Sequence, residues 1–426
     1  MENRKMKPSG IEWIGDIPFD WNVVPVKYFF SIGRGRVISV LDLCDDGKYP
    51  VYSSQTENNG CFGYLNTYDY SGPAITWTTD GAKAGTVFFR DGKYNCTNVC
   101  GILTFKNDNF KRSNIRFMTY AIGMAAEQNK RKDINGYKIM SNEMANIRFA
   151  VPSLDIQNSI AKFLDQKCLE IDALVTDIQS QIDILEEYKK SVITEVITNG
   201  LNPNVKMKNS GIEWIGLVSE DANIFRLKFF SYMKGRIGWQ GLKSTDFIDD
   251  GPYCVTGTDF QNGKVNWETC YHVSEKRYEM DSNIHIKEGD LLMTKDGTIG
   301  KLAIIDELPD KACLNSHLLI IRPLENKYIN KYLYYVMQSH IFSKYYTLVS
   351  SGSTMDSLSQ EKTGNFSIPS YSIEKQKKIV EYLDNKCLEI NAIISEKKQQ
   401  IETLTNCKTS LIYEYVTGKK QVKENA

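Results

Sequence analysis

The chain contains the same blocks of sequence twice, and this internal repeat restricts its possible folds more than any other feature. Residues 6–15 recur almost unchanged as residues 207–216, and residues 163–171 recur as residues 382–390. The segments between these blocks differ almost everywhere. A tandem repeat with two diverged interiors predicts two copies of one domain, in the order variable region, repeated segment, variable region, repeated segment.

Two stretches that contain the second repeated block have the pattern of long helices. Apolar residues recur at steps of three and four over residues 160–196 and 379–415, with charged residues between them. Proline precedes each stretch and glycine follows it, at Pro152, Pro369, Gly200 and Gly418. A helix of about 40 residues is roughly 60 Å long, and narrow apolar stripes are typical of coiled coils. We therefore expect the two helices to pair antiparallel about a pseudo-twofold axis; the alternative is that each packs only on its own variable region.

The variable regions have the pattern of small mixed domains. Short β-type runs between Asp-Gly, Asn-Gly and other glycine-containing turns predict strands at residues 74–78, 85–89, 101–105, 290–294 and 318–322. Helical patterns occupy matching places in the two copies, at residues 116–123 and 332–339. The predicted fold class is α+β, with two globular mixed α/β domains separated by two long antiparallel coiled-coil helices. The predicted divisions are the first variable domain at 1–150, the first helix with its linker at 151–205, the second variable domain at 206–367 and the second helix at 368–426.

Composition excludes several classes of protein. The 52 basic residues balance the 52 acidic ones, so nucleic-acid binding would require basic side chains gathered on particular faces. No apolar stretch approaches the roughly 20 residues of a membrane span, and the start of the chain is polar, so we expect a cytoplasmic protein without membrane association. The ten cysteines and four histidines lack metal-site spacing, which predicts reduced thiols and no bound metal.

The sequence also lacks the common catalytic motifs. It contains no GxxxxGK[ST] phosphate loop, no HExxH, no GxSxG and no convincing dinucleotide-binding glycine loop. Residues 202–205, Asn-Pro-Asn-Val, are faintly similar to the Asn-Pro-Pro-aromatic motif of amino-methyltransferases. They lack the second proline and the aromatic residue, and we interpret them as a linker turn. We therefore expect a protein without catalytic activity of its own.

Two turns occupy the same place in the two copies and combine glycines with lysine. They are residues 79–85 and 294–301. Such turns allow a backbone to approach phosphate closely while lysine adds charge, but Asp-Gly is also ordinary hairpin chemistry. A polar loop also precedes each long helix, at residues 130–136 before the first and 351–354 before the second. These loops, too, could contact DNA or could be ordinary connections at the surface.

Taken together in this order, the motifs resemble the DNA-specificity subunit of type I restriction-modification systems. The resemblance rests on the Ser-Gly-Ile-Glu-Trp-Ile-Gly leader, the Ile-Pro-Phe-Asp-Trp that follows it, the strand and turn at 289–301, the Ser-Gly-Ser-Thr loop at 351–354 and the Pro-Ser-x-x-Ile entry to each long helix. It covers essentially the whole chain. The first copy departs from the pattern, because its turn is Gly-Ala-Lys-Ala-Gly at 81–85 and residues 132–138 lack Ser-Gly-Ser.

The resemblance implies a function in DNA recognition. In that family each variable region reads one half of a split, asymmetric sequence in double-stranded DNA, and the paired helices set the gap. Two modification subunits bind S-adenosylmethionine, dock on the helices and methylate an adenine in each half-site. Two restriction subunits translocate and cut the DNA. The cofactors S-adenosylmethionine, ATP and magnesium would thus be held by partner subunits only. The partner-binding candidates on the helix stripes are Leu164, Ile171, Ile178, Leu185, Leu383, Ile390, Leu404 and Leu411.

Direct readout favours Arg or Lys on guanine and Asn or Gln on adenine, which selects residues on the predicted loops. The candidates for DNA contact are Arg34, Arg36, Gln55, Thr56 and Lys83 in the first domain and Lys234, Arg236, Thr258, Asp259, Lys295, Ser353 and Thr354 in the second. Two other classes of function stay open. One is a self-sufficient methyltransferase or nuclease, and the other is a coiled-coil interaction scaffold or a related subunit without DNA specificity.

Overall fold

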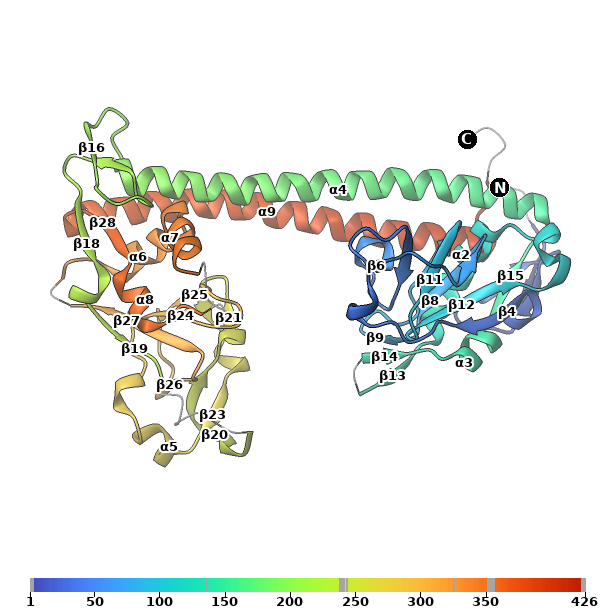
Figure 1. The fold of residues 1–426 in the computed structure, drawn as a ribbon, viewed down its shortest axis with the longest axis horizontal. Coiled ribbons are helices and arrows are strands. Elements are labelled where there is room, and N and C mark those ends of the chain that lie inside the picture. The colour runs from blue at the N-terminus through green and yellow to red at the C-terminus, as the bar shows by residue number, and fades with distance from the viewer. Residues whose placement is uncertain are drawn as a thin grey trace. The chain divides into compact units, whose positions relative to one another are not determined.

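The computed structural model describes residues 4–134, 136–236, 242, 244–324, 326–350 and 357–422 (Figure 1). The chain divides into two compact units, each described here by itself. Unit 1 comprises Met1–Gln179 with Gln399–Ala426, and unit 2 comprises Ser180–Lys398. The boundary between the units falls within both long helices, α4 (Leu154–Asn199) and α9 (Ile373–Val416).

Unit 1 is built on a four-stranded antiparallel sheet with the strand order β10-β8-β12-β4. Its strands are β4 (Phe30–Arg34), β8 (Ala74–Thr78), β10 (Val87–Arg90) and β12 (Cys100–Phe105). A second sheet has the order β6-β5-β11-β7, from β5 (Tyr49–Tyr52), β6 (Cys61–Leu65), β7 (Tyr70–Ser71) and β11 (Lys93–Cys96). Strands β11 and β5 of this sheet run parallel.

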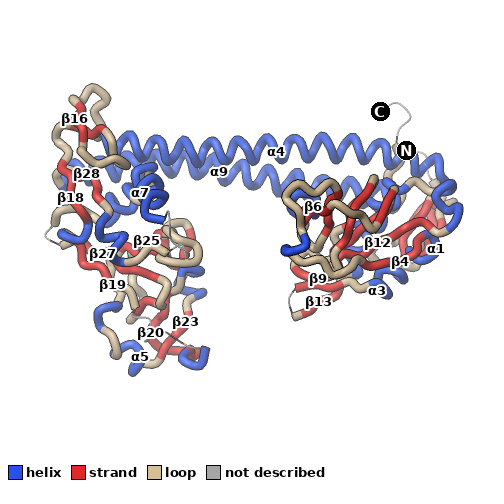
Figure 2. Tube along the Cα trace, viewed as in Figure 1, coloured by secondary structure: helices blue, strands red, loops and turns tan. Residues whose placement is uncertain are grey.

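Unit 2 repeats this topology. Its main sheet has the order β19-β27-β24-β25, from β19 (Ser231–Lys234), β24 (Leu291–Thr294), β25 (Leu302–Ile304) and β27 (Leu318–Pro323). A second sheet joins β23 (Tyr271–Val273), β20 (Phe247–Val255) and β26 (Ala312–Leu314), and β20 again runs parallel to its partner β26. The diverged interiors therefore keep one strand order, and the predicted strands and their alternation with turns are confirmed (Figure 2).

Small paired strands occur at matching places in both units. The repeated leaders form the hairpins β1 (Met6–Pro8) with β2 (Asp16–Pro18) and β16 (Met207–Asn209) with β17 (Leu217–Ser219). The strands that enter and leave each domain pair as β3 (Asn22–Pro25) with β15 (Arg148–Val151) and β18 (Asn223–Arg226) with β28 (Ser367–Ser370). Unit 2 also contains the hairpin of β21 (Phe260–Gln261) and β22 (Lys264–Val265).

Shorter helices pack against the sheets and complete the cores; most lie beside the main sheets, whereas α5 lies beside β20 of the second sheet. They are α1 (Val26–Phe29), α2 (Ile115–Asn129) and α3 (Ser141–Asn146) in unit 1, and α5 (Glu275–Glu279), α6 (Asn330–Val336), α7 (His340–Ser350) and α8 (Gln360–Asn365) in unit 2. The predicted helices at 116–123 and 332–339 correspond to α2 and to α6 with its exit. Asn114 precedes helix α2 as its N-cap, and its side chain accepts hydrogen bonds from two backbone N–H groups of the first turn. Its buried residues, including Phe117, pack with Trp77 of β8 and Leu164 of α4 in one apolar core.

The long helices pair antiparallel within each unit, as the apolar stripes predicted. In unit 1 the Lys408 ammonium of α9 donates to Asp172 of α4 at 2.7 Å. In unit 2 Lys189 of α4 donates to the Asn391 side chain of α9 at 3.0 Å. Each helix ends at a glycine in the left-handed conformation, Gly200 (φ 76°) or Gly418 (φ 73°). Among the described residues, no helix is long and apolar enough to cross a membrane.

Candidate nucleic-acid interface

The loops at one edge of the main sheet bring several predicted DNA-contact residues together in unit 2. Strands β19 and β24 both run antiparallel to β27, with Lys234 opposite Ile320 and Thr294 opposite Leu318. The carboxyl ends of β19 and β24 therefore meet the start of β27. We call this edge, with the turn that follows each strand, the loop face.

The turn at 294–301 is held by its own backbone. The Gly300 N–H donates to the Thr294 carbonyl at 2.9 Å, and the Lys301 N–H donates to the Thr294 hydroxyl at 2.9 Å. Gly297 (φ 69°) and Gly300 (φ 80°) adopt the left-handed conformation that side chains disfavour. These contacts fix the direction in which the strand leaves the sheet at Lys295.

Backbone hydrogen bonds on both sides fix Lys295 itself. Its N–H donates to the carbonyl of His317 at 2.9 Å, and its carbonyl accepts from the N–H of Leu358 at 2.7 Å. A Cβ atom at Gly235, just after β19, would lie 2.9 Å from the Leu318 carbonyl oxygen and 3.6 Å from the Lys295 Nζ. The absence of a side chain at Gly235 therefore lets the end of β19 approach the Leu318 carbonyl at the start of β27 closely.

Unit 1 builds its loop face with the same hydrogen bonds. The Thr79 N–H donates to the Val99 carbonyl at 3.2 Å, and the Thr79 carbonyl accepts from the Ile139 N–H at 2.8 Å. The Gly85 N–H donates to the Thr78 carbonyl at 2.9 Å, and the Thr86 N–H donates to the Thr78 hydroxyl at 3.1 Å. We call this shared set of bonds the loop frame. It places Thr79 where unit 2 has Lys295, and Val99 where unit 2 has His317.

The two predicted arginines of unit 1 extend from the end of β4. Arg34 is exposed and its Nε donates to the Asn98 carbonyl, at the loop face. The Arg36 side chain is 51% exposed and its Nε donates to the Asp69 carboxylate at 2.8 Å. A Cβ atom at Gly35, between them, would overlap the carbonyl oxygen of Cys96. The ion pair leaves Arg36 less free than Arg34 to meet a phosphate.

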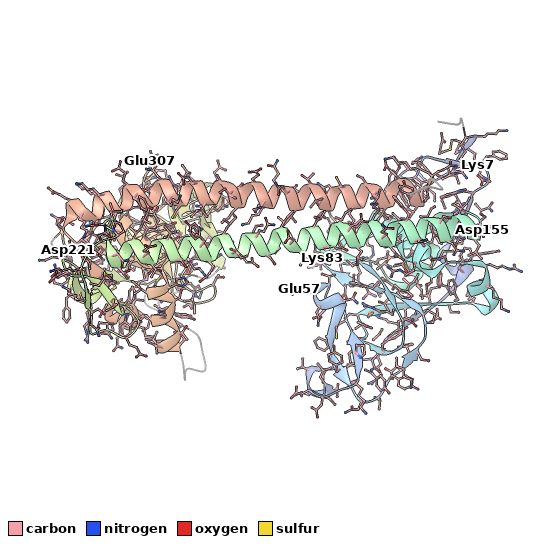
Figure 3. The ribbon with its side chains drawn as sticks, turned by 90° about the horizontal axis from the view of Figure 1, so that it is seen from above. Lys7, Glu57, Lys83, Asp155, Asp221 and Glu307 are labelled. Carbon is pink, nitrogen blue, oxygen red and sulfur yellow. The ribbon has the colours of Figure 1, made fainter. Side chains whose placement is uncertain are left out.

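The other predicted residues of unit 1 occupy two further loops. Gln55 is exposed and its amide donates to the Cys61 carbonyl, and Thr56 follows it at the start of a short 3-10 turn. Lys83, labelled in Figure 3, is exposed on the turn after β8. Its backbone carbonyl accepts from the Thr78 hydroxyl at 2.6 Å. The Lys83 ammonium has no partner among the described residues.

The structure joins two loops that the sequence analysis treated separately. Strand β9 (Asp80–Gly81), in the Lys83 turn, pairs with β14 (Gly136–Lys138), which pairs with β13 (Arg131–Asp133). A Cβ atom at Gly136 (φ 119°) would lie 3.0 Å from the backbone nitrogen of Ala82. Arg131 donates to Glu143 at 2.7 Å, whereas Lys132 is exposed without a partner among the described residues. Lys132 thus lies in a small sheet whose strand β9 leads into the turn that carries Lys83.

Arg236 and Asp259, predicted to contact DNA, are structural residues instead. Arg236 is 3% exposed, and its guanidinium donates to the Leu314 carbonyl at 2.9 Å. Asp259 is 2% exposed and accepts from the Thr256 N–H at 2.7 Å in a capping box. Both side chains are engaged inside the domain in this structure, which speaks against their predicted contact with DNA. The sequence Thr-Gly-Thr-Asp at 256–259 has the spacing of a capping box, with a threonine at the N-cap and an acidic residue three positions later.

Of the remaining predicted residues of unit 2, three belong to the loop face and two lie outside the described residues. Lys234 and Thr258 are exposed, and Lys295 is half-buried. Gly257, beside Thr258, packs on Thr294, because a Cβ atom there would lie 2.7 Å from the Thr294 methyl carbon. Lys234, Thr258 and Lys295 therefore belong to the loop face. Ser353 and Thr354 lie outside the described residues.

Sequence reasoning missed His317. Its side chain is 68% exposed at the loop face, and its Nδ1 is bonded to the Asp296 carboxylate. Nothing in the sequence singles it out, because Asp296 lies in another turn and the pairing depends on the sheet register. Among the described residues, no cluster of three or more His, Cys, Asp or Glu side chains could hold a metal ion.

Several stripe residues predicted to bind a partner are instead buried. Leu164 and Leu383 are fully buried and Ile390 is 3% exposed, so these three belong to the core in this structure, which speaks against their predicted role in partner binding. Ile171, Ile178, Leu185, Leu404 and Leu411 are partly buried. Other apolar residues of the two helices are exposed, among them the stripe residues Leu174, Tyr188 and Ile393 and, off the stripes, Leu169, Ile184, Tyr382 and Leu388.

In unit 2 both long helices carry exposed apolar and aromatic residues. Ile184 is 67% exposed, Tyr188 50% and Tyr382 44%. The pKa of Lys386 is raised, mainly by its hydrogen bond to the Glu389 carboxylate. Tyr188 lies four residues after Ile184 on α4, and Lys386 lies four residues after Tyr382 on α9, so each pair shares one face of its helix. We call Ile184, Tyr188, Tyr382 and Lys386 the helix patch.

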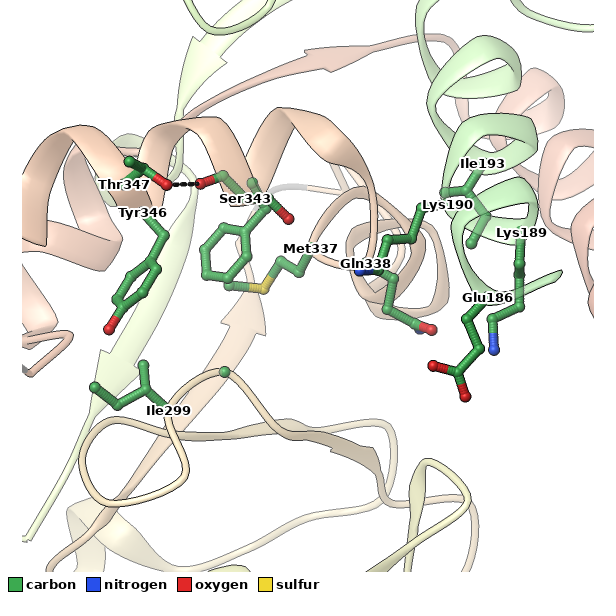
Figure 4. Close-up of a pocket in the computed structure, with 12 residues that line it drawn as sticks. Glu186, Lys189, Lys190, Ile193, Ile299, Met337, Gln338, Ser343, Tyr346 and Thr347 are labelled. Carbon is green, nitrogen blue, oxygen red and sulfur yellow. Dashed lines mark hydrogen bonds between the residues drawn. The ribbon is translucent and has the colours of Figure 1, made fainter. Parts of the chain in front are cut away.

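A separate recess of about 470 Å³ lies between α4, α7 and the end of the 294–301 turn (Figure 4). Glu186, Lys189 and Lys190 line it from α4, and Ile299 lines it from the turn. A Cβ atom at Gly300 would lie 3.6 Å from the Phe342 ring of α7. The turn that presents Lys295 is thus packed against α7 on its other side.

The structure thus consists of two domains of one topology, each with a loop face. Comparison with known proteins specifies the family. The pattern for the type I restriction modification DNA specificity domain matches residues 18–183 and again residues 238–403. The chain belongs to this family of type I DNA specificity subunits.

Individual relatives agree with the family. The MjaVIII specificity subunit, from a type I restriction enzyme of Methanocaldococcus jannaschii, is 23% identical over 423 residues, which cover 96% of this chain and 94% of that subunit. The MpnII specificity subunit of Mycoplasma pneumoniae is 31% identical over 198 residues, 45% of this chain and 58% of that subunit. A solved structure described as the structural basis of assembly and conformational transition of the type I R-M system has a TM-score of 0.62 and 14% identity, over 95% of this chain and 99% of that one. That likeness concerns the fold.

Proposed function

We propose that this chain is the specificity subunit of a type I restriction-modification complex and that each unit reads one half of a bipartite, asymmetric DNA sequence. One observation carries the proposal. The loop frame is the same in both units, yet the side chains at matching positions differ, with Thr79 against Lys295 and Val99 against His317. A constant scaffold that presents different side chains suits two unlike half-sites.

In this proposal the loop faces enter the major groove. Arg34 in unit 1 and Lys234 in unit 2 supply the donors that guanine edges accept. Lys83 and Lys295 are positioned on turns where they can neutralise phosphate. The net charge of the chain is zero, so affinity depends on these local groups and on partner subunits.

The helix patch is the proposed docking surface for a modification subunit on unit 2. Exposed aromatic and aliphatic side chains of this kind are enriched where proteins bind each other. Leu169 and Leu174, 73% and 52% exposed, provide apolar surface on α4 in unit 1. The α4 and α9 pair would set the spacer between the half-sites. Two modification subunits and two restriction subunits would supply catalysis and hold S-adenosylmethionine, ATP and magnesium.

The test is to co-express the chain with its modification subunit in a methylation-free host and to map modified adenines across the genome. The expected result is one split asymmetric motif with a methylated adenine on each strand. An assembled complex that modifies no such motif would contradict the proposal and favour a scaffold without DNA specificity. Methylation by the purified chain alone would contradict the assignment of catalysis to partners.

A further inference from the structure

One position of the loop frame carries a polar residue in unit 2 and an apolar residue in unit 1. His317 immediately precedes Leu318, which pairs with Thr294, and Val99 immediately precedes Cys100, which pairs with Thr78. The carbonyl of each accepts the backbone bond that fixes the turn, at 2.9 Å from Lys295 and at 3.2 Å from Thr79. His317 and Val99 therefore occupy the same place in the two units.

The His317 ring is held in one orientation. Its Nδ1 is bonded to the Asp296 carboxylate, and the side chain is 68% exposed. A carboxylate accepts a hydrogen bond, so Nδ1 carries the proton. The Nε2 atom has no partner among the described residues. It presents a lone pair in the neutral ring and an N–H group in the protonated ring.

The bond between His317 and Asp296 is not needed to form the turn. Unit 1 has an aspartate at the matching position, Asp80, but Val99 in place of the histidine. Its turn nevertheless forms the same backbone bonds. The loop frame is thus independent of the side chain at this position, and the pairing in unit 2 serves instead to orient the ring.

We propose that this position determines base specificity in both units, an inference that rests on the proposed function. The Nε2 of His317 hydrogen-bonds a base edge in the half-site that unit 2 reads. Val99, which is half-buried, contacts an apolar group, the thymine methyl, in the half-site that unit 1 reads. Asp296 acts through His317 as a positioning residue.

The test uses the complete complex with modification subunits and a duplex library randomised in both half-sites. We expect His317→Val to reduce discrimination at one base position of one half-site by about tenfold or more, since a single base contact contributes discrimination of that order. The other half-site provides an internal control because it should not change. Val99→His should alter a position in that other half-site only. Lys276→Ala, exposed on α5 outside the loop face, is the matched control and should change neither.

Three outcomes would overturn the inference. His317→Val could leave every base preference unchanged, or it could weaken methylation of all sequences equally, as loss of a phosphate contact would. In both cases a normal bipartite pattern in the wild-type complex would leave the proposed function standing. A wild-type complex that recognises no bipartite sequence would instead overturn the proposed function together with this inference.

Discussion

The Arg116 guanidinium of α2 donates to the Asp165 carboxylate of α4, with 2.6 Å between Nη2 and Oδ1. Tyr120 donates to the same oxygen at 2.8 Å. In unit 2 the corresponding aspartate of the repeated block, Asp384, accepts from Tyr335 and pairs with Lys331 at 3.2 Å. This aspartate therefore fastens the variable domain to the long helix in both units. This contact accounts for the presence of the aspartate in both copies of the repeated block.

Replacing Asp165 by asparagine should lower the stability of unit 1. The hydrogen bond to Asp165 is the main reason that the pKa of Arg116 is raised, but both side chains are more than a third exposed. We therefore expect a loss of only about 1 kcal/mol in the free energy of unfolding, measured in urea. Glu381→Gln, at an exposed carboxylate of α9 without a partner among the described residues, should have no such effect. Equal losses of unfolding free energy in Asp165→Asn and Glu381→Gln would show that Asp165 does not fasten the variable domain to α4.

Replacing Lys295 by alanine should weaken binding to all DNA sequences similarly. A lysine that neutralises phosphate contributes affinity without sequence information, and its removal should reduce the salt slope of binding by about one. The measurement is the affinity of the assembled complex for a duplex over a range of salt concentrations. An unchanged slope, or a loss confined to certain bases, would show that Lys295 does not meet phosphate.

Replacing Gly35 by alanine should impair recognition of a single half-site. The added Cβ would overlap the Cys96 carbonyl, so the segment that carries Arg34 and Arg36 would have to shift. Gly123→Ala is the control, because a Cβ there would lie 3.6 Å from Val87 in ordinary contact. Methylation of a library randomised in both half-sites reports the effect. A Gly35→Ala variant with wild-type discrimination would mean that this segment does not contribute to recognition.

Replacing Tyr188 by serine should weaken the binding of a modification subunit. The side chain is 50% exposed and belongs to the helix patch. We expect a loss of at least tenfold in affinity if Tyr188 is central to the interface, measured by titrating the purified subunits. Ile248→Ser, at a residue 44% exposed in β20, is the control. Similar affinities for wild type and Tyr188→Ser would place the docking surface elsewhere.

Acid should weaken the contact between the second leader and α9. The pKa of Asp221 is lowered, mainly by hydrogen bonds from Lys375 and Ser219. A carboxyl group whose pKa is lower in the folded state stabilises the fold above its unfolded value, near 3.9, and loses this contribution as the pH falls through the folded value. Lys375→Met should therefore flatten the dependence of stability on pH below about 4, measured by thermal unfolding. If Lys375→Met loses stability below about pH 4 as steeply as the wild type, other carboxyl groups are responsible for the sensitivity to acid.

Much of the fold follows from local sequence patterns. The stripes of α4 and α9 and the runs at β8, β12, β24 and β27 are determined by side-chain periodicity, which a sequence displays directly. The repeat added the expectation that both interiors share one topology, although they differ in sequence.

The candidate site was less predictable because its contacts join distant residues. Arg236 is buried, and its guanidinium binds the Leu314 carbonyl, 78 positions away. The sequence showed only an arginine in a predicted loop, which is why it was a candidate for DNA contact. His317 acquires its orientation from Asp296 across a sheet edge. The pairing of the Lys83 turn with residues 136–138 likewise depends on tertiary structure. Side-chain type identified the candidates, whereas only the register of the sheets decides which of them reach the surface together.

The loop frame also affects how new specificities can arise. Its bonds join main-chain atoms, apart from the threonine hydroxyl of Thr78 or Thr294, so the side chains at positions such as Thr79 and Lys295, or Val99 and His317, differ while the backbone bonds persist. Under the proposed function, a substitution at one of these positions would change the DNA sequence that is recognised without disrupting the turn that presents it. The subunit could then acquire a new target without passing through an unstable intermediate.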